Sequence, residues 1–128
     1  MIALRNEILR KPLGLSFKAE ELDREKEDIL IGAFEDDQML GCCLLTRMDN
    51  KNVRLRQMAV QDNLRGKGIG AAMMNFAENV ARDLGYHVMI MHARKTAVGF
   101  YEKLGYKVAG KEFEEITIPH YIMEKHLR

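Results

Sequence analysis

The chain has 128 residues, 47% of them hydrophobic, and its 20 Lys and Arg residues are balanced by 19 Asp and Glu residues, for a formal net charge of +1. This length and apolar content allow one globular core, so we expect a single domain over residues 1–128. A charge so close to neutral argues against a nucleic-acid partner, and the longest apolar run, residues 39–45, is too short to span a bilayer.

The first eleven residues carry no apolar block, so they do not resemble a secretory signal, and we expect a cytoplasmic protein with no membrane partner. Leu4 and Ile8 share a helix face, and Pro12 would end that helix. A second helix is predicted over residues 17–28, with Ser16 as its N-cap. Most side chains of this second segment are charged, so we expect it at the surface.

Three strands are predicted next, over residues 29–34, 39–48 and 53–60, with short polar turns between them. Such turns between apolar runs are typical of hairpins, so we expect antiparallel neighbours. Cys42 and Cys43 lie side by side in the second strand, where successive side chains point to opposite faces. They predict neither a disulfide nor a thiolate metal site, and we expect no metal.

The third of these strands changes the phase of its alternation. Val53 and Leu55 alternate with arginines, whereas the later apolar positions, Met58 and Val60, are one residue out of step. A β-bulge near Gln57 would restore the two faces. Burial of the strand end on both sides explains the pattern equally well.

The sequence Arg-Gly-Lys-Gly-Ile-Gly connects this strand to a helix. Its glycines, Gly66, Gly68 and Gly70, allow backbone N–H groups to approach a ligand closely. The helix N-terminus adds about half a positive charge, and Arg65 and Lys67 add two mobile cations. The segment therefore predicts an anion-binding site.

The helix after this loop has the clearest pattern in the chain, because apolar residues recur every three or four positions from Ile69 until Gly85 ends it. A strand over residues 87–91 follows and completes a βαβ unit. The remaining predicted elements are a helix over residues 95–104 and strands over residues 106–113 and 118–125. Together the elements predict an α+β (mixed α/β/α) fold with a central, mostly antiparallel sheet.

Two common anion-binding patterns do not fit the glycine-rich loop. A P-loop requires Ser or Thr directly after its lysine, and none follows Lys67. A dinucleotide-binding fingerprint lies near the first strand and needs an acidic residue at the end of the next strand, which here ends in Met91 and His92.

The pattern R-x-x-G-x-G at residues 65–70, preceded by M-A-V at 58–60, resembles the signature of the GNAT superfamily of acyl-CoA N-acyltransferases. Residues 97–106, AVGFYEKLGY, are similar to a second motif of that family. Residues 118–123, IPHYIM, resemble the last strand of a small bacterial-type subgroup. The resemblance covers roughly residues 29–125 and implies the GNAT fold, with a β-bulge and a splayed strand pair.

The resemblance implies acetyl-CoA as the co-substrate, with its pyrophosphate on the backbone amides of the loop and its pantetheine arm paired to the splayed strand. The implied cofactor-binding residues are Met58, Ala59, Val60, Arg65, Gly66, Lys67, Gly68, Ile69, Gly70 and Arg94. There are two departures from the family. Arg94 and Lys95 stand where many members have an asparagine that contacts the cofactor. The usual first strand has no predicted counterpart, either because the fold is trimmed or because a partner subunit completes it.

The resemblance also maps the tyrosine that protonates the departing CoA thiolate onto Tyr101. Backbone N–H groups near Ala59 or Val60 are candidates for polarising the thioester carbonyl. A general base must take the proton of the amine, and His92 and His120 have the intrinsic pKa for this role.

The acceptor side of the site is less well defined by the sequence. Glu21, Glu27 and Asp28 lie in the segment that forms the acceptor-side wall in this family, although a solvated helix face is the simpler interpretation. Glu114 and Glu115 are expected in a loop, where they could attract a cationic amine.

Two hypotheses about function therefore stay open. The first is an N-acetyltransferase that passes an acetyl group from acetyl-CoA to a primary amine of a small molecule or to an exposed amino group, by direct attack in a ternary complex. The second is a non-catalytic module of the same fold that binds or senses CoA. The predicted strand over residues 118–125 offers a surface through which a homodimer can form.

Overall fold

The computed structural model describes residues 4–7, 15–23, 28–61 and 68–128. Its nine strands form one sheet in the order β1-β2-β3-β4-β5-β6-β9-β7, with β8 paired to β9. Their bounds are β1 (Leu4–Glu7), β2 (Leu15–Asp23), β3 (Asp28–Glu35), β4 (Gln38–Arg47), β5 (Asn52–Val60), β6 (Val88–Arg94), β7 (Lys107–Val108), β8 (Phe113–Glu115) and β9 (Ile118–His126). The neighbouring strands are antiparallel except β5 and β6, which are the parallel strands of the predicted βαβ unit.

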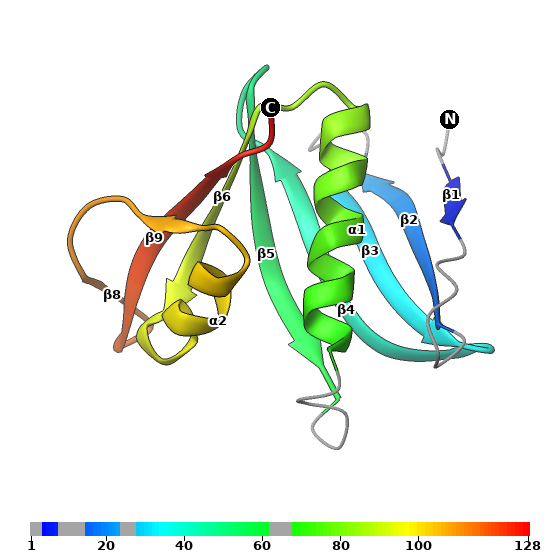
Figure 1. Ribbon diagram of the computed structural model, residues 1–128, viewed down its shortest axis with the longest axis horizontal. Helices are drawn as coiled ribbons and strands as arrows, with labels where there is room; N and C mark the ends of the chain where they lie inside the picture. The colour runs from blue at the N-terminus through cyan, green and yellow to red at the C-terminus, as the bar shows by residue number, and fades with distance from the viewer. Residues whose placement is uncertain (1–3, 8–14, 24–27, 62–67) are drawn as a thin grey trace.

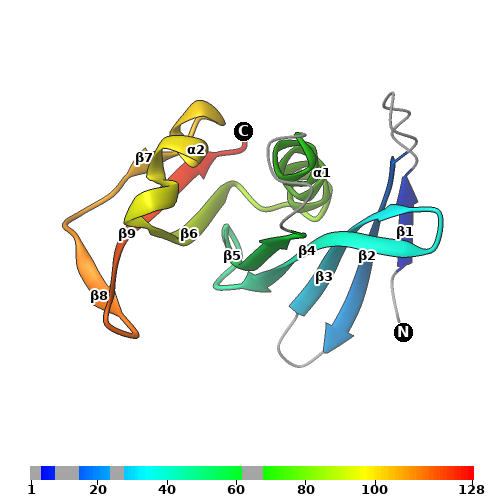
Figure 2. The same ribbon diagram turned by 90° about the horizontal axis from the view of Figure 1, so that it is seen from below.

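The two helices lie on one face of this sheet. Helix α1 (Ile69–Asp83) crosses β2 to β5, whereas the 3₁₀ turn η2 (Lys95–Ala97) and helix α2 (Val98–Lys103) lie against β6 and β9 (Figure 1). Seen from below, α1 and α2 stand on the same side of the strands (Figure 2). Neither helix of the described chain is long and apolar enough to cross a membrane.

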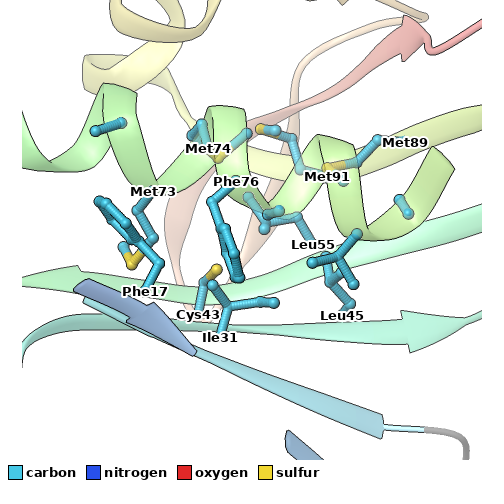
Figure 3. Close-up of a cluster of buried hydrophobic side chains, with 14 of the residues drawn as sticks. Phe17, Ile31, Cys43, Leu45, Leu55, Met73, Met74, Phe76, Met89 and Met91 are labelled. Carbon is cyan, nitrogen blue, oxygen red and sulfur yellow. The ribbon is translucent and has the colours of Figure 1, made fainter. Parts of the chain in front are cut away.

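The core lies between α1 and the sheet. Phe76 of α1 stacks on Phe17 of β2, with ring centroids 5.5 Å apart, and Met73 and Met74 on the same helix are also buried. Figure 3 shows these side chains meeting Ile31 and the other inward residues of the central strands. Burial of a large apolar side chain contributes roughly 1.5–3 kcal/mol, so this interface holds α1 against the sheet.

The described residues of the N-terminal third are extended, so the helices predicted there are wrong. Leu15, Phe17 and Ala19 are buried at alternate positions of β2, which is the period of a strand. The intervening charged residues favour helices intrinsically, and pairing with β1 on one side and β3 on the other overrides that preference. The chain also does not lack an N-terminal strand, because β1 and β2 extend the sheet. The portions of the predicted helices at residues 8–14 and 24–27 lie outside the described residues.

The predicted irregularity in β5 is a β-bulge. Leu44 of β4 pairs with Arg56 and Cys42 pairs with Ala59, so two residues of β5 face one residue of β4. One of the two, Gln57, has a φ of 55°, a left-handed backbone conformation that residues other than glycine rarely adopt. The alternative, a strand end buried on both faces, is therefore not needed.

Beyond the bulge, β5 and β6 diverge. They pair from Asn52 with Val88 to Leu55 with Met91, and no later pair between them is described. Figure 1 shows the two strands spreading apart toward the N-terminus of α1. We call residues 56–60 of β5 and residues 92–94 of β6 the splayed edges.

The C-terminal segment differs from its prediction in two places. The strand expected over residues 106–113 is only β7, because Gly110, at a φ of 97°, turns the chain away. Glu114 and Glu115, expected in a loop, belong to β8 and pair with the first residues of β9.

Candidate active site

The splayed edges carry backbone N–H and C=O groups that face each other without a strand partner in the described part of the chain. Backbone N–H and C=O groups in this position can form hydrogen bonds with water or with a ligand. The N-terminus of α1 lies beside the end of β5, and α2 lies beside the end of β6 (Figure 1). The two helices thus flank a pair of strand edges that can accept an extended ligand.

The N-terminus of α1 is built to receive an anion. Gly68 is its N-cap at a φ of 80°, no side chain caps the helix, and its first turn contains no acidic residue. A Cβ at Gly68 would meet no atom of the described residues within 4 Å. Residues 65–67, which contain the other half of the predicted anion loop, lie outside the described residues.

Tyr101 reaches into the protein from α2. Its side chain is only 7% exposed, and burial, together with the neighbouring Cys43 thiol, raises the pKa of its hydroxyl to about 12. Cys43 belongs to β4, opposite the bulge. The Tyr101 hydroxyl therefore lies on the helix side of the sheet and keeps its proton at neutral pH.

Phe100, the neighbour of Tyr101, connects α2 to the start of α1. A Cβ on Gly70 would lie 3.3 Å from the Phe100 ring and 3.8 Å from Val60. Gly41 of β4 plays a similar part behind the bulge, because a Cβ there would lie 2.9 Å from the carbonyl oxygen of Ala59. Glycine at these two positions allows the elements around the splayed edges to approach one another.

A polar cluster lies on the opposite face of the sheet, below the point where β5 and β6 separate. Arg54 Nη2 lies 2.9 Å from His92 Nδ1 and 3.8 Å from a carboxylate oxygen of Glu115. Since a guanidinium can only donate, His92 Nδ1 accepts this hydrogen bond. The neutral His92 ring therefore carries its proton on Nε2.

His120 has the opposite tautomer. Its Nδ1 lies 2.7 Å from the carbonyl oxygen of Ile118, and a carbonyl can only accept, so Nδ1 carries the proton. The lone pair is then on Nε2, which lies 3.7 Å from Glu115 Oε2. The same carboxylate oxygen is 3.5 Å from His92 Nδ1.

The predicted catalytic residues thus form two groups separated by the sheet. Met91 and Ala93 of β6 are buried toward the helices, so His92 between them points to the other face. His120 pairs in register with Arg94 and shares that face. Tyr101 belongs to the helix side. The predicted cofactor residues Met58, Ala59 and Val60 lie along one splayed edge, and Arg94 ends the other.

Sequence reasoning missed the parts of Arg54 and Glu115 in the polar cluster. The alternation of β5 places Arg54 on the outer face, but nothing in the sequence shows that β8 folds back along β9 and brings Glu115 to it. The predicted acceptor-side residues Glu21 and Asp28 lie on β2 and β3 instead of on a helix, and Glu27 is outside the described residues. No group of three or more potential metal ligands occurs among the described residues.

Comparison with known proteins agrees with this architecture. Residues 15–127 match the model of the acetyltransferase (GNAT) domain family. "Uncharacterized N-acetyltransferase YjcF" of Bacillus subtilis is 32% identical over 125 residues, which cover 95% of this chain and 87% of that protein. Some matches are shorter: the chain spans about half the length of "Uncharacterized N-acetyltransferase CT2212" of Chlorobaculum tepidum, with 32% identity over 76 residues, 59% of this chain and 48% of that protein.

A solved structure shares the fold at lower identity. The crystal structure of an aminoglycoside 6'-N-acetyltransferase complexed with coenzyme A superposes with a TM-score of 0.72 and 19% identity, over 80% of this chain and 74% of that one. The predicted mixed α+β fold, with its bulge and splayed strand pair, is confirmed by this agreement and by the strand pairing.

Proposed function

The chain belongs to the GNAT family of acetyltransferases, and we propose that it transfers an acetyl group from acetyl-CoA to a primary amine of a small molecule or to an exposed amino group. The observation that carries the proposal is the pair of splayed edges, flanked by an uncapped helix N-terminus on one side and by Tyr101 on the other. The proposal treats residues 1–128 as one acetyltransferase domain.

In this proposal α1 and the splayed edges bind different parts of the cofactor. The N–H groups at the start of α1, with the positive end of the helix dipole, favour a pyrophosphate. The amide groups of a pantetheine arm have the same donors and acceptors as a peptide strand, so they can pair with the free edge of β5 at Met58 and Val60. The related aminoglycoside acetyltransferase was crystallised with coenzyme A, which supports the choice of cofactor.

Tyr101 stabilises the leaving sulfur in this proposal. A thiol ordinarily has a pKa near 8.5, so complete proton transfer to a thiolate from a hydroxyl whose pKa is about 12 is unfavourable. The hydroxyl instead donates a hydrogen bond to the developing thiolate, which takes up a solvent proton after release. A charge-assisted hydrogen bond of this kind contributes about 1.5–3 kcal/mol.

His120 is the better of the two candidate bases because of its tautomer. A neutral imidazole accepts a proton through the nitrogen that carries the lone pair. In His120 that nitrogen is Nε2, whereas in His92 it is Nδ1, already occupied by the Arg54 guanidinium. We therefore assign proton acceptance to His120 and leave His92 with an orienting role.

The positions of the two groups favour direct attack. The amine approaches from the face that carries His120, its nitrogen bonds to the thioester carbon, and its proton passes to Nε2. The C–S bond then breaks toward the face that carries Tyr101, and His120 returns its proton to solvent. Amine and acetyl-CoA must be bound together for this sequence, so we propose a ternary complex without an acetylated enzyme.

The test is incubation of the purified protein with acetyl-CoA and a panel of primary amines, with detection of free thiol and of the acetylated product. We expect turnover on at least one amine and a loss of roughly a hundredfold or more in kcat for His120→Gln, the scale of general-base catalysis. His126→Gln, at the far exposed end of β9, is the matched control. Failure of calorimetry to detect CoA binding would refute the proposed cofactor, and binding without turnover on any amine would refute the enzyme.

A further inference from the structure

We propose that Glu115 is a positioning residue that holds the imidazole of His120 for proton transfer, an inference that rests on the function proposed above. Glu115 is the only group in the described polar cluster that approaches both histidines and the arginine. Its Oε2 lies 3.5 Å from His92 Nδ1 and 3.7 Å from His120 Nε2, and its Oε1 lies 3.8 Å from Arg54 Nη2.

The charges of the cluster explain why a carboxylate is needed there. Arg54 is permanently positive, and its Nε is buried without a hydrogen-bond partner among the described residues. When His120 takes a proton from the amine it becomes a second cation close to this guanidinium. The Glu115 carboxylate lies between the two and offsets both charges. Arg94, in register with His120 on β6, adds a further positive charge at the same end of the sheet.

The ring packing explains how the carboxylate can act on orientation. Phe113, two residues before Glu115 on β8, meets His92 edge-on with centroids 5.2 Å apart and lies 5.9 Å from His120. One short strand therefore supplies both the apolar surface on which the two rings rest and a carboxylate that lies within 3.7 Å of one nitrogen of each ring. The Ile118 carbonyl fixes Nδ1 of His120 in the neutral ring. Once Nε2 has taken a proton, the carboxylate attracts the charged ring from the other end.

The turn that presents Glu115 is conformationally expensive. Glu115 pairs with Ile118, and the two residues between them, Ile116 and Thr117, have φ values of 54° and 61°. β-Branched residues in the left-handed region are true outliers, and strain of this kind persists where the surrounding structure over-determines it. Here it closes the tightest hairpin that places Glu115 on the same face as His120.

The test is a double-mutant cycle in steady-state kinetics, with Glu115→Gln, His120→Gln and the combined variant. Glu114→Gln is the matched control, because Glu114 is the exposed neighbour on the other face of the same strand. We expect Glu115→Gln to lower kcat roughly tenfold, with KM for both substrates within about twofold, since general-base catalysis supplies about 10²–10⁴ in all. In the His120→Gln background the same change should have no further effect, because residues that act through one another are non-additive.

Three results would overturn the inference. The first is a kcat for Glu115→Gln as high as that for Glu114→Gln, and the second is a combined variant in which the two losses of kcat multiply. The third is an effect confined to the KM for the amine, which would make Glu115 an acceptor-binding group. If the wild-type protein has no turnover, the proposed function fails separately, and NMR still decides the positioning role. The ring resonances of both His92 and His120 should shift in Glu115→Gln, and neither should shift in Glu114→Gln. Unchanged ring resonances would refute the role.

Discussion

Tyr101 keeps its proton throughout the neutral range, because burial raises the pKa of its hydroxyl to about 12. In the proposed reaction it can therefore donate a hydrogen bond to the departing sulfur throughout that range. Replacing Tyr101 with Phe removes this donor and little else. We expect kcat to fall roughly ten- to a hundredfold, the equivalent of about 1.5–3 kcal/mol, while CoA affinity measured by calorimetry stays within about twofold. Equal turnover by the variant and the wild type would exclude Tyr101 from the reaction.

The same pKa shift has a consequence for stability in alkali. The unfolded chain loses the Tyr101 proton near its ordinary pKa of 10.0, whereas the folded protein keeps it up to about 12. The contribution of Tyr101 to the free energy of unfolding is thus constant below about pH 10. It falls as the pH rises from about 10 to about 12, by roughly 2–3 kcal/mol, because each unit of pKa difference is worth about 1.4 kcal/mol. Urea unfolding at several pH values should show a smaller loss for Tyr101→Phe than for the wild type; parallel curves would contradict this.

Gly41 is the residue that permits the close approach of β4 to the bulged strand. A Cβ there would lie 2.9 Å from the Ala59 carbonyl oxygen, and backbone cannot yield as a flexible side chain can. We expect Gly41→Ala to destabilise the fold by about 1–3 kcal/mol and to weaken CoA binding, measured by urea unfolding and calorimetry. Gly99→Ala is the control, since a Cβ within α2 meets nothing within 4 Å and should be neutral or stabilising by up to about 1 kcal/mol. Equal effects of the two changes would exclude the contact.

At the scale of elements, the sequence predicted best where periodicity and end signals agree. Helix α1 shows both, with a repeating apolar face and Gly85 at its end in the left-handed conformation. Strands β3, β4 and β5 are apolar runs bounded by polar turns, and the phase slip in β5 located the bulge. Strand β2 was missed because its charged residues mask the alternation of Leu15, Phe17 and Ala19. The segment fits a helical period as well as a strand period, and only pairing with the neighbouring strand decides between them.

The β8–β9 hairpin was missed for a different reason. Two-residue hairpin turns with positive φ at both central positions normally contain Asn and Gly, and here the positions are Ile116 and Thr117. No turn rule marks such a pair, so Glu115 could not be brought to the histidines from the sequence. The candidate site residues on β5 and α2 are predictions from motifs that resemble a family, whereas the polar partners of the two histidines depend on this one unrecognised turn.

The strain in this turn can be relieved without moving Glu115. Ile116→Asn combined with Thr117→Gly supplies residues that adopt the same φ values at low cost, so we expect the free energy of unfolding to rise by about 1–3 kcal/mol. Turnover should stay within about twofold because the register of β8 and β9 is kept. Ile116→Ala alone is the control: it removes the 87% exposed side chain but retains the strained backbone. A stability gain of the same size in the control would attribute the effect to exposure instead of strain.

At the scale of the whole molecule, the sheet divides where β5 and β6 diverge. The two strands are paired at one end, and at the other end each belongs to a separate part of the sheet, which we call a wing. Helix α1 packs on the wing that contains β2 to β5, and α2 packs on the wing that contains β6, β9 and β7 (Figure 2). Glu115 connects Arg54 of one wing to His120 of the other. The wings follow from the strand order and the divergence of two strands, which local sequence patterns do not contain.

Cofactor binding should join the two wings. We expect saturating CoA to slow amide hydrogen exchange at the splayed edges, residues 56–60 and 92–94, and at the start of α1, while residues 15–23 are unaffected. At a CoA concentration of 100 times Kd the free energy of unfolding should rise by about 2.7 kcal/mol. Adenosine bisphosphate, which lacks the pantetheine arm, is the control and should protect the helix start only. Equal protection of both strand edges by the two ligands would refute pairing with the pantetheine arm.

The splayed edges also bear on the solubility of the protein. An unpaired strand edge is a template for another chain, and proteins ordinarily blunt or cover such edges at the rim of a sheet. This sheet has two of them in its middle. The proposed function requires them to stay open, because a strand inserted there would occupy the place proposed for the cofactor. On the proposed binding mode, coenzyme A covers these open strand edges as well as taking part in the reaction, and each release of product exposes them to self-association until the next cofactor molecule binds.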